Sequence, residues 1–72
     1  MSMERIYKSA FCKAELTAFL KAVDRDIRNA RYEEIGDEEY VRINFNNGSS
    51  RRVCVTADSL LAMARDVLKV VE

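Results

Sequence analysis

The chain has 72 residues, of which 49% are apolar, so it suits one small folded domain and is too apolar for a disordered segment. Its 12 basic and 12 acidic side chains balance, so no overall charge draws the chain to nucleic acid or to a membrane surface. Histidine is absent and the two glycines form no phosphate-binding loop, so we expect a single domain, residues 1–72, that is not an enzyme and uses no cofactor or metal.

The N-terminal third contains a helix whose start is ambiguous. Within residues 3–12, Ile6, Tyr7 and Phe11 fit either a helical stripe or a strand. From Lys13 the apolar residues recur at helical spacing, with charged residues between them. This stripe consists of Leu16, Phe19, Leu20, Val23 and Ile27.

Three strands are expected next, over residues 29–35, 38–45 and 50–56, because apolar and polar residues alternate there. Gly36-Asp37 suits a two-residue type II′ turn, which pairs Ile35 with Glu38. A three-residue loop over residues 46–48, with Gly48 in the left-handed conformation, aligns the next two strands. With these registers the apolar residues of all three strands share one face.

A second helix follows, with Asp58 as its expected N-cap and an apolar stripe that begins at Leu60. The predicted fold class is therefore α+β, a three-stranded antiparallel meander with both helices on one face (αβββα) and the other face open. The residues expected in the core are Leu20, Val23, Ile43, Val55, Leu61, Ala64 and Leu68.

The open face should carry a row of like charges, Arg31, Arg42 and Arg52, next to Tyr40. Like charges directly opposite in a sheet are destabilising, whereas an anionic ligand would neutralise them. This row is a candidate anion or nucleic-acid site, on which Tyr40 could stack a base. The alternative is a solvated face that nearby glutamates screen.

Acidic residues crowd the first hairpin, and we expect them to be too exposed to matter for folding. They could contact a partner by mimicking phosphates, form a solubilising turn, or bind a metal, although the spacing of a calcium loop is missing. These candidate partner-binding residues are Glu33, Glu34, Asp37, Glu38 and Glu39.

Two further features concern the cysteines and the last helix. Cys12 and Cys54 are too few for the disulfide framework of a small secreted domain, so we expect free thiols, with Cys54 on the open face. On the last helix, Met63, Val67 and Val70 can either pack against the first helix or form a homodimer seam.

The run from Arg52 to Val67, preceded by Asn47-Gly48 on a hairpin, resembles the C-terminal half of small uncharacterised proteins from phages and prophages of Gram-positive bacteria. Some of these look positive-cofactor-four-like, and one such group acts as an anti-CRISPR. The resemblance implies an accessory protein that binds and modulates a host protein or nucleoprotein in the bacterial cytoplasm. The alternative function is a small nucleic-acid-binding module that uses the open sheet face. No apolar run reaches the roughly 20 residues of a membrane span.

Overall fold

The computed structural model describes residues 3–71 and consists of a helical rod, three strands and a final helix. The chain is therefore α+β with the predicted αβββα order, and the ambiguous residues 3–12 are helical. The rod comprises α1 (Met3–Phe11), a π-helical segment η1 (Cys12–Leu16) and α2 (Thr17–Val23). It is followed by β1 (Ile27–Ile35), β2 (Glu38–Phe45), β3 (Ser50–Cys54) and α3 (Leu60–Val71).

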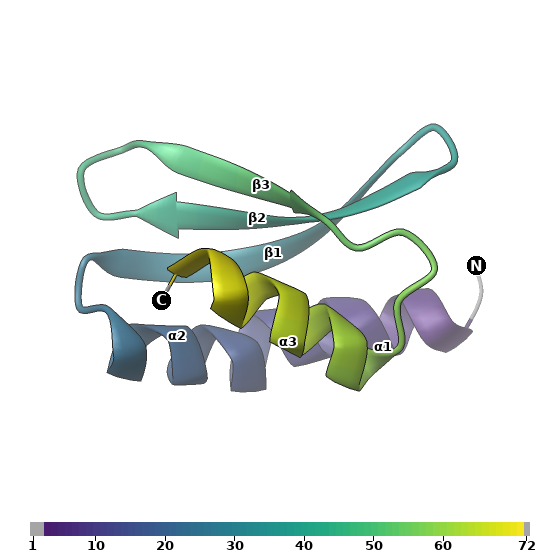
Figure 1. Ribbon diagram of the computed structural model, residues 1–72, viewed down its shortest axis with the longest axis horizontal. Helices are drawn as coiled ribbons and strands as arrows, with labels where there is room; N and C mark the ends of the chain where they lie inside the picture. Colours follow the sequence, from purple (N-terminus) through teal and green to yellow (C-terminus); the bar gives the residue numbers. More distant parts are fainter. Residues whose placement is uncertain (1–2, 72) are drawn as a thin grey trace.

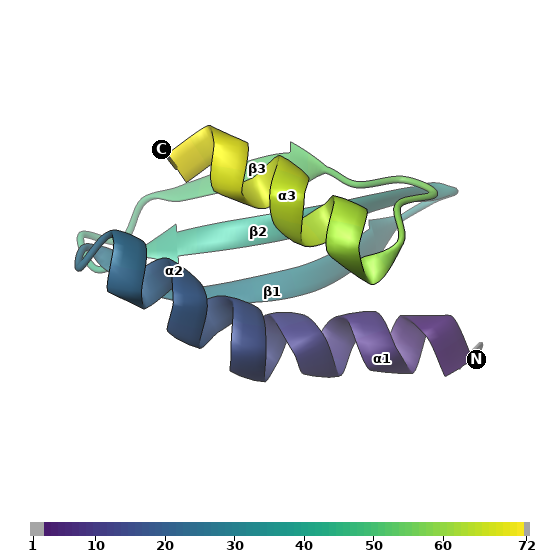
Figure 2. The same ribbon diagram turned by 60° about the horizontal axis from the view of Figure 1, so that its bottom comes forward.

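The molecule has two layers, a sheet and a layer of helices (Figure 1). The sheet is a meander of order β1-β2-β3, and all the helices lie beneath the same face of it. Turned by 60°, the molecule shows the rod running beside β1 while α3 crosses beneath β2 and β3 (Figure 2). Among residues 3–71, no helix covers the opposite face of the sheet, as the alternation of its residues predicts.

Both predicted hairpin registers are confirmed. Gly36 has a φ of 62°, and the two-residue turn pairs Ile35 with Glu38. Gly48 has a φ of 89°, and the amide of Phe45 donates to the carbonyl of Ser49 over 2.9 Å, which closes the three-residue loop. These two turns place Val41 and Ile43 in the core and their even-numbered neighbours on the open face.

The first helix ends earlier than predicted. α2 stops at Val23, and Ile27, expected on the helical stripe, is a fully buried residue of β1. The reason is local, because the carboxylate of Asp24 accepts the amide of Asp26 at 2.9 Å and offers the backbone a turn in place of another helical bond. Val23, expected in the core, ends the helix and is 48% exposed.

The last helix begins at Leu60, one residue later than an N-cap at Asp58 would give. The N-cap is Ser59, whose hydroxyl accepts the amide of Ala62 at 3.2 Å, and the prediction of Asp58 is wrong. Met63 and Val67 of α3 are buried beneath the sheet, whereas Leu61, about 200° from Met63 around the helix axis, faces away. Leu61 was expected in the core and is 80% exposed, whereas Met63 is fully buried.

The hydrophobic core is one cluster between the sheet and the helices. Leu20, Ile43 and Val55 are buried as predicted, and Ala64 and Leu68 are half-buried against the cluster. The largest fully buried apolar side chains of the cluster are Cys12, Leu16, Leu20, Ile27, Val41, Ile43, Val55, Met63 and Val67.

Thr17 joins the helical rod to the edge of the sheet. Its hydroxyl donates to the carbonyl of Cys12 at 2.6 Å and accepts the amide of Ala30 at 2.9 Å. The backbone of the π-helical turn and the backbone of β1 are thus both hydrogen-bonded to the Thr17 hydroxyl. This contact sets how closely the rod approaches β1.

Candidate macromolecule-binding face

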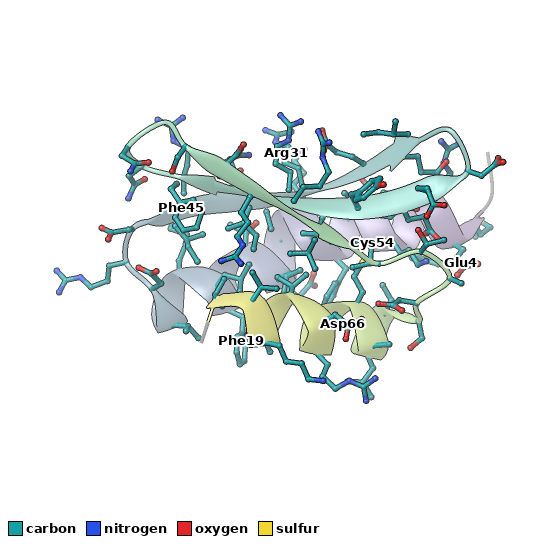
Figure 3. All side chains as sticks on the ribbon, turned by 45° about the horizontal axis from the view of Figure 1, so that its top comes forward. Glu4, Phe19, Arg31, Phe45, Cys54 and Asp66 are labelled. Atoms are coloured by element: carbon teal, nitrogen blue, oxygen red, sulfur yellow. The ribbon has the colours of Figure 1, made fainter. Side chains whose placement is uncertain are left out.

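The predicted arginine row is present on the open face of the sheet. Arg31 is paired with Arg42 across β1 and β2, and Arg42 with Arg52 across β2 and β3. Arg31 and Arg52 are exposed and Arg42 is half-buried. Figure 3 shows Arg31 projecting from the sheet on the side away from the helices. Adjacent strands lie about 4.8 Å apart, so the row spans roughly 10 Å of surface.

One carboxylate serves two of these arginines. Glu33 Oε1 lies 3.2 Å from Nε of Arg42 and 3.5 Å from Nε of Arg52. Within residues 3–71, Arg31 makes no ion pair or side-chain hydrogen bond. Three guanidinium groups thus face one carboxylate, which leaves the centre of the open face with two uncompensated positive charges.

Tyr40 is held beside this row. It pairs with Glu33 on one side and with Cys54 on the other, and the guanidinium of Arg52 lies over its ring, 5.5 Å from the centroid. This distance is that of a cation–π contact. The face is therefore a planar, positively charged surface with one aromatic ring that is already stacked by an arginine.

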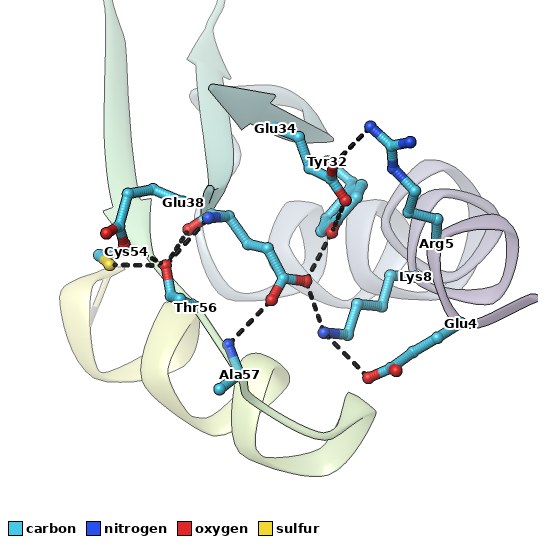
Figure 4. A network of polar contacts seen from close by, with 10 residues as sticks. Glu4, Arg5, Lys8, Tyr32, Glu34, Glu38, Cys54, Thr56 and Ala57 are labelled. Carbon is cyan, nitrogen blue, oxygen red and sulfur yellow. Dashed lines mark hydrogen bonds and ion pairs between the residues drawn. The ribbon is translucent and has the colours of Figure 1, made fainter. Parts of the chain in front are cut away.

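The acidic hairpin does not form one free carboxylate cluster. Glu33 is used by the arginines, and Glu34 forms an ion pair with Arg5 and lies 3.0 Å from the hydroxyl of Tyr32. Glu38 accepts the hydroxyl of Thr56 at 2.6 Å (Figure 4). Asp37, in the turn, is exposed. The carboxylates predicted as a joint partner-binding site are therefore divided between two faces and mostly have partners within the protein.

Glu39 is the clearest departure from the expectation that the acidic residues are dispensable for folding. Its side chain is only 19% exposed, and its Oε1 lies 2.7 Å from Nζ of Lys8 and 2.5 Å from the hydroxyl of Tyr32. Its Oε2 accepts the amide of Ala57 at 2.8 Å. The hydrogen bonds from Lys8 and Tyr32 lower the pKa of Glu39 to about 2. This residue joins the helical rod, the sheet and the loop before α3.

Lys8 was not singled out by the sequence, yet it is 1% exposed. Burial lowers the pKa of Lys8, but hydrogen bonds and the charges of Glu39 and Glu4 outweigh that effect and raise it. The sequence does contain an indication that Lys8 is buried. Four residues follow one another at four-residue steps along the buried side of the rod: Lys8, Cys12, Leu16 and Leu20. A lysine on such a stripe needs a buried carboxylate.

The two cysteines are free thiols in different surroundings. Cys54 is exposed on the open face, with its Sγ 3.5 Å from Oγ1 of Thr56. Cys12 is buried, and burial raises the pKa of its thiol to about 12, which keeps it protonated and unreactive. Residues 3–71 contain no group of three or more His, Cys, Asp or Glu side chains that could hold a metal ion.

A homodimer seam is one of the two alternatives for Met63, Val67 and Val70, and packing within the molecule is the other. Met63 and Val67 are fully buried inside one molecule, and Val70 packs partly against the same core. Met63 and Val67 therefore pack in the core of one molecule, as the second of these alternatives has it. In the described part of the chain, no helix is long and apolar enough to cross a membrane.

Comparison of the chain with protein-family models, curated proteins and solved structures found no match in any of the three.

Proposed function

We propose that this protein is a non-enzymatic accessory protein that binds a polyanionic macromolecule through the open face of its sheet. The observation that carries the proposal is the Arg31–Arg42–Arg52 row, in which Glu33 pairs with Arg42 and Arg52 while Arg31 has no ion pair within residues 3–71. Such a row is destabilising without a counter-charge, and a bound anion would supply one.

The open face is favoured over the acidic hairpin as the contact surface. Four of the five hairpin carboxylates, all except Asp37, already have partners within the protein. A macromolecule that recruited them would have to break contacts that hold α1 and the loop before α3. Within the arginine row, Arg31 can take an anion without rearrangement, because it has no side-chain partner within residues 3–71. Arg42 and Arg52 would exchange only their contacts to Glu33 and Tyr40, which hold neither α1 nor the loop before α3.

Single-stranded nucleic acid is the ligand that suits this surface best. Guanidinium forks bind phosphates in a bidentate manner, and Tyr40 offers a ring to a base if Arg52 moves from its stacked position to a phosphate. The resemblance to phage and prophage proteins adds a setting, in which the protein acts in the cytoplasm of a bacterial host on a nucleic acid or nucleoprotein, as an anti-defence factor would.

Fluorescence anisotropy with a labelled single-stranded oligonucleotide at two salt concentrations tests this proposal. Arg31→Ala and Arg42→Ala should each weaken binding, and each should flatten the dependence of log K on log salt by about 0.7. Arg65→Ala, on α3 and off the open face, is the matched control and should bind like the parent.

Two outcomes would count against the proposal. Absence of binding at low salt would remove nucleic acid as the ligand. Equal loss of binding in the Arg65→Ala control would show that the attraction is general and that the open face is not the site.

A further inference from the structure

The free edge of β1 carries backbone groups that the sheet does not use. Val55 donates its amide to the carbonyl of Glu39 at 2.9 Å, and Phe45 bonds to Ser49, so the odd-numbered residues of β2 pair with β3. Its even-numbered residues therefore pair with β1, and the alternation of an antiparallel ladder directs the backbone of Tyr32 and Glu34 away from the sheet.

Ala30, which precedes Tyr32 by two positions on β1, confirms that the backbone groups of these residues point away from the sheet. The amide of Ala30 points outward and donates to Oγ1 of Thr17 at 2.9 Å. No such acceptor reaches the amides of Tyr32 and Glu34 among residues 3–71. Thr17 thus closes one end of the edge, and the other end remains open beside α1.

A hollow of about 500 Å³ lies beside these two residues, between the edge of β1 and the helical rod. Ser9 and Ala10 leave room because their side chains are short, and Ile6, which is 47% exposed, provides an apolar wall. The ion pair between Arg5 and Glu34 spans from helix to strand near Tyr32 (Figure 4). A hollow with an apolar wall next to unpaired strand groups is what an added strand requires.

Charge specifies the sequence of such a strand. Arg31 lies on the open face of the edge strand and makes no ion pair within residues 3–71. Side chains of an added strand would alternate, one set facing Ile6 and Ala10 and the other continuing the row of Arg31. The first set should be apolar and the second acidic.

The geometry points to the edge of β1 at Tyr32 and Glu34 as a strand-addition site for an extended peptide segment that alternates apolar and acidic residues. This surface is separate from the arginine–Tyr40 face, although Arg31 borders both. The edge of β3 is a poorer candidate, because Arg51 occupies a core-facing position there, opposite Ile43. A charged residue at such a position protects a strand edge from pairing.

The test uses the full chain and a synthetic peptide, acetylated and amidated, of three Glu-Val repeats. Titration is followed by NMR, together with hydrogen exchange of the backbone amides. In the free protein the amides of Tyr32 and Glu34 should exchange quickly, and the peptide should slow both by at least about tenfold. A peptide N-methylated at alternate residues keeps the side chains but lacks the N–H donors, so it should not protect these amides.

Variants separate this site from the sheet face. Arg31→Glu, at an exposed position beside this edge, should weaken the acidic peptide by about two- to fivefold, as expected for one surface charge pair, and should weaken the oligonucleotide as well. Arg42→Ala should leave peptide binding unchanged while weakening the oligonucleotide.

Four results would each overturn the inference. They are no binding at millimolar peptide, equal binding of the N-methylated peptide, protection at Ser50 and Arg52 on the β3 edge, and a dimer in sedimentation that already protects Tyr32. The last result would show that a second copy of the chain covers this edge.

Discussion

The ammonium of Lys8 on α1 lies 2.7 Å from the carboxylate of Glu39 on β2, in a site where the lysine is almost fully buried. Glu39 is also bound by Tyr32 from β1 and by the amide of Ala57 from the loop before α3. One carboxylate therefore connects all three parts of the fold. The same contacts remove Glu39 from the surface that the acidic hairpin could offer to a partner.

Loss of the Lys8 ammonium should destabilise the protein strongly. In Lys8→Met the Glu39 carboxylate keeps Tyr32 and Ala57 but loses its counter-charge, and breaking a buried pair in this way costs about 3 kcal/mol. Urea denaturation measures the change. Lys13→Met, at an exposed position of the same rod, is the control and should change stability by less than about 0.5 kcal/mol. Equal stability of the two variants would show that the pair contributes nothing.

Glu39 should also set the response of the protein to acid. Its pKa is about 2 in the folded protein against an ordinary value of 4.5, so its contribution to stability is complete above pH 4.5. That contribution is lost progressively as the pH falls from 4.5 to about 2, because in this range the unfolded chain takes up a proton that the folded carboxylate does not, and the loss is complete once the folded carboxylate is protonated as well. Glu39→Gln should be less stable at neutral pH and lose less on acidification, whereas Asp37→Asn in the exposed turn should follow the parent. Parallel acid curves for Glu39→Gln and the parent would contradict this assignment.

The rotation of α3 can be tested with two residues that are two positions apart. Met63→Ala should lower the free energy of unfolding by about 2–5 kcal/mol, because Met63 is fully buried. Leu61→Ala, at an 80% exposed position, should change it by less than about 0.5 kcal/mol. Thermal or urea unfolding distinguishes the two, and the reverse order would mean that the helix presents its other apolar side to the sheet.

Thr17 should be important for its hydroxyl rather than for its size. Thr17→Val keeps the shape but leaves the Ala30 amide and the Cys12 carbonyl without this partner, at a cost of about 1–3 kcal/mol for a buried unpaired group. Thr17→Ser retains the hydroxyl and should recover most of the stability. Faster hydrogen exchange of the Ala30 amide in Thr17→Val, but not in Thr17→Ser, would confirm the contact; no difference between the two variants would refute it.

Local patterns predicted the sheet well and the helices less well. Turn chemistry at Gly36 and Gly48, together with strict alternation, leaves one register that keeps the apolar residues on one face, so the arginine row follows directly from the sequence. The end of the first helix was misplaced because Ile27 fits a helical stripe equally well, and the turn at Asp24 decides the matter.

By itself, the sequence determined the αβββα order, both hairpin registers and the charge of the open face, because these depend on residues adjacent along the chain or across a tight turn. Only the tertiary structure decided which side of α3 is buried, since α3 has apolar residues on two sides and packing against the sheet buries only the side of Met63 and Val67. It also decided that Lys8 is buried and that the acidic hairpin is divided. Those outcomes depend on contacts between α1, the first hairpin and the loop before α3. The residues in contact lie far apart in the sequence, 31 positions for Lys8 and Glu39, so no local pattern predicts them.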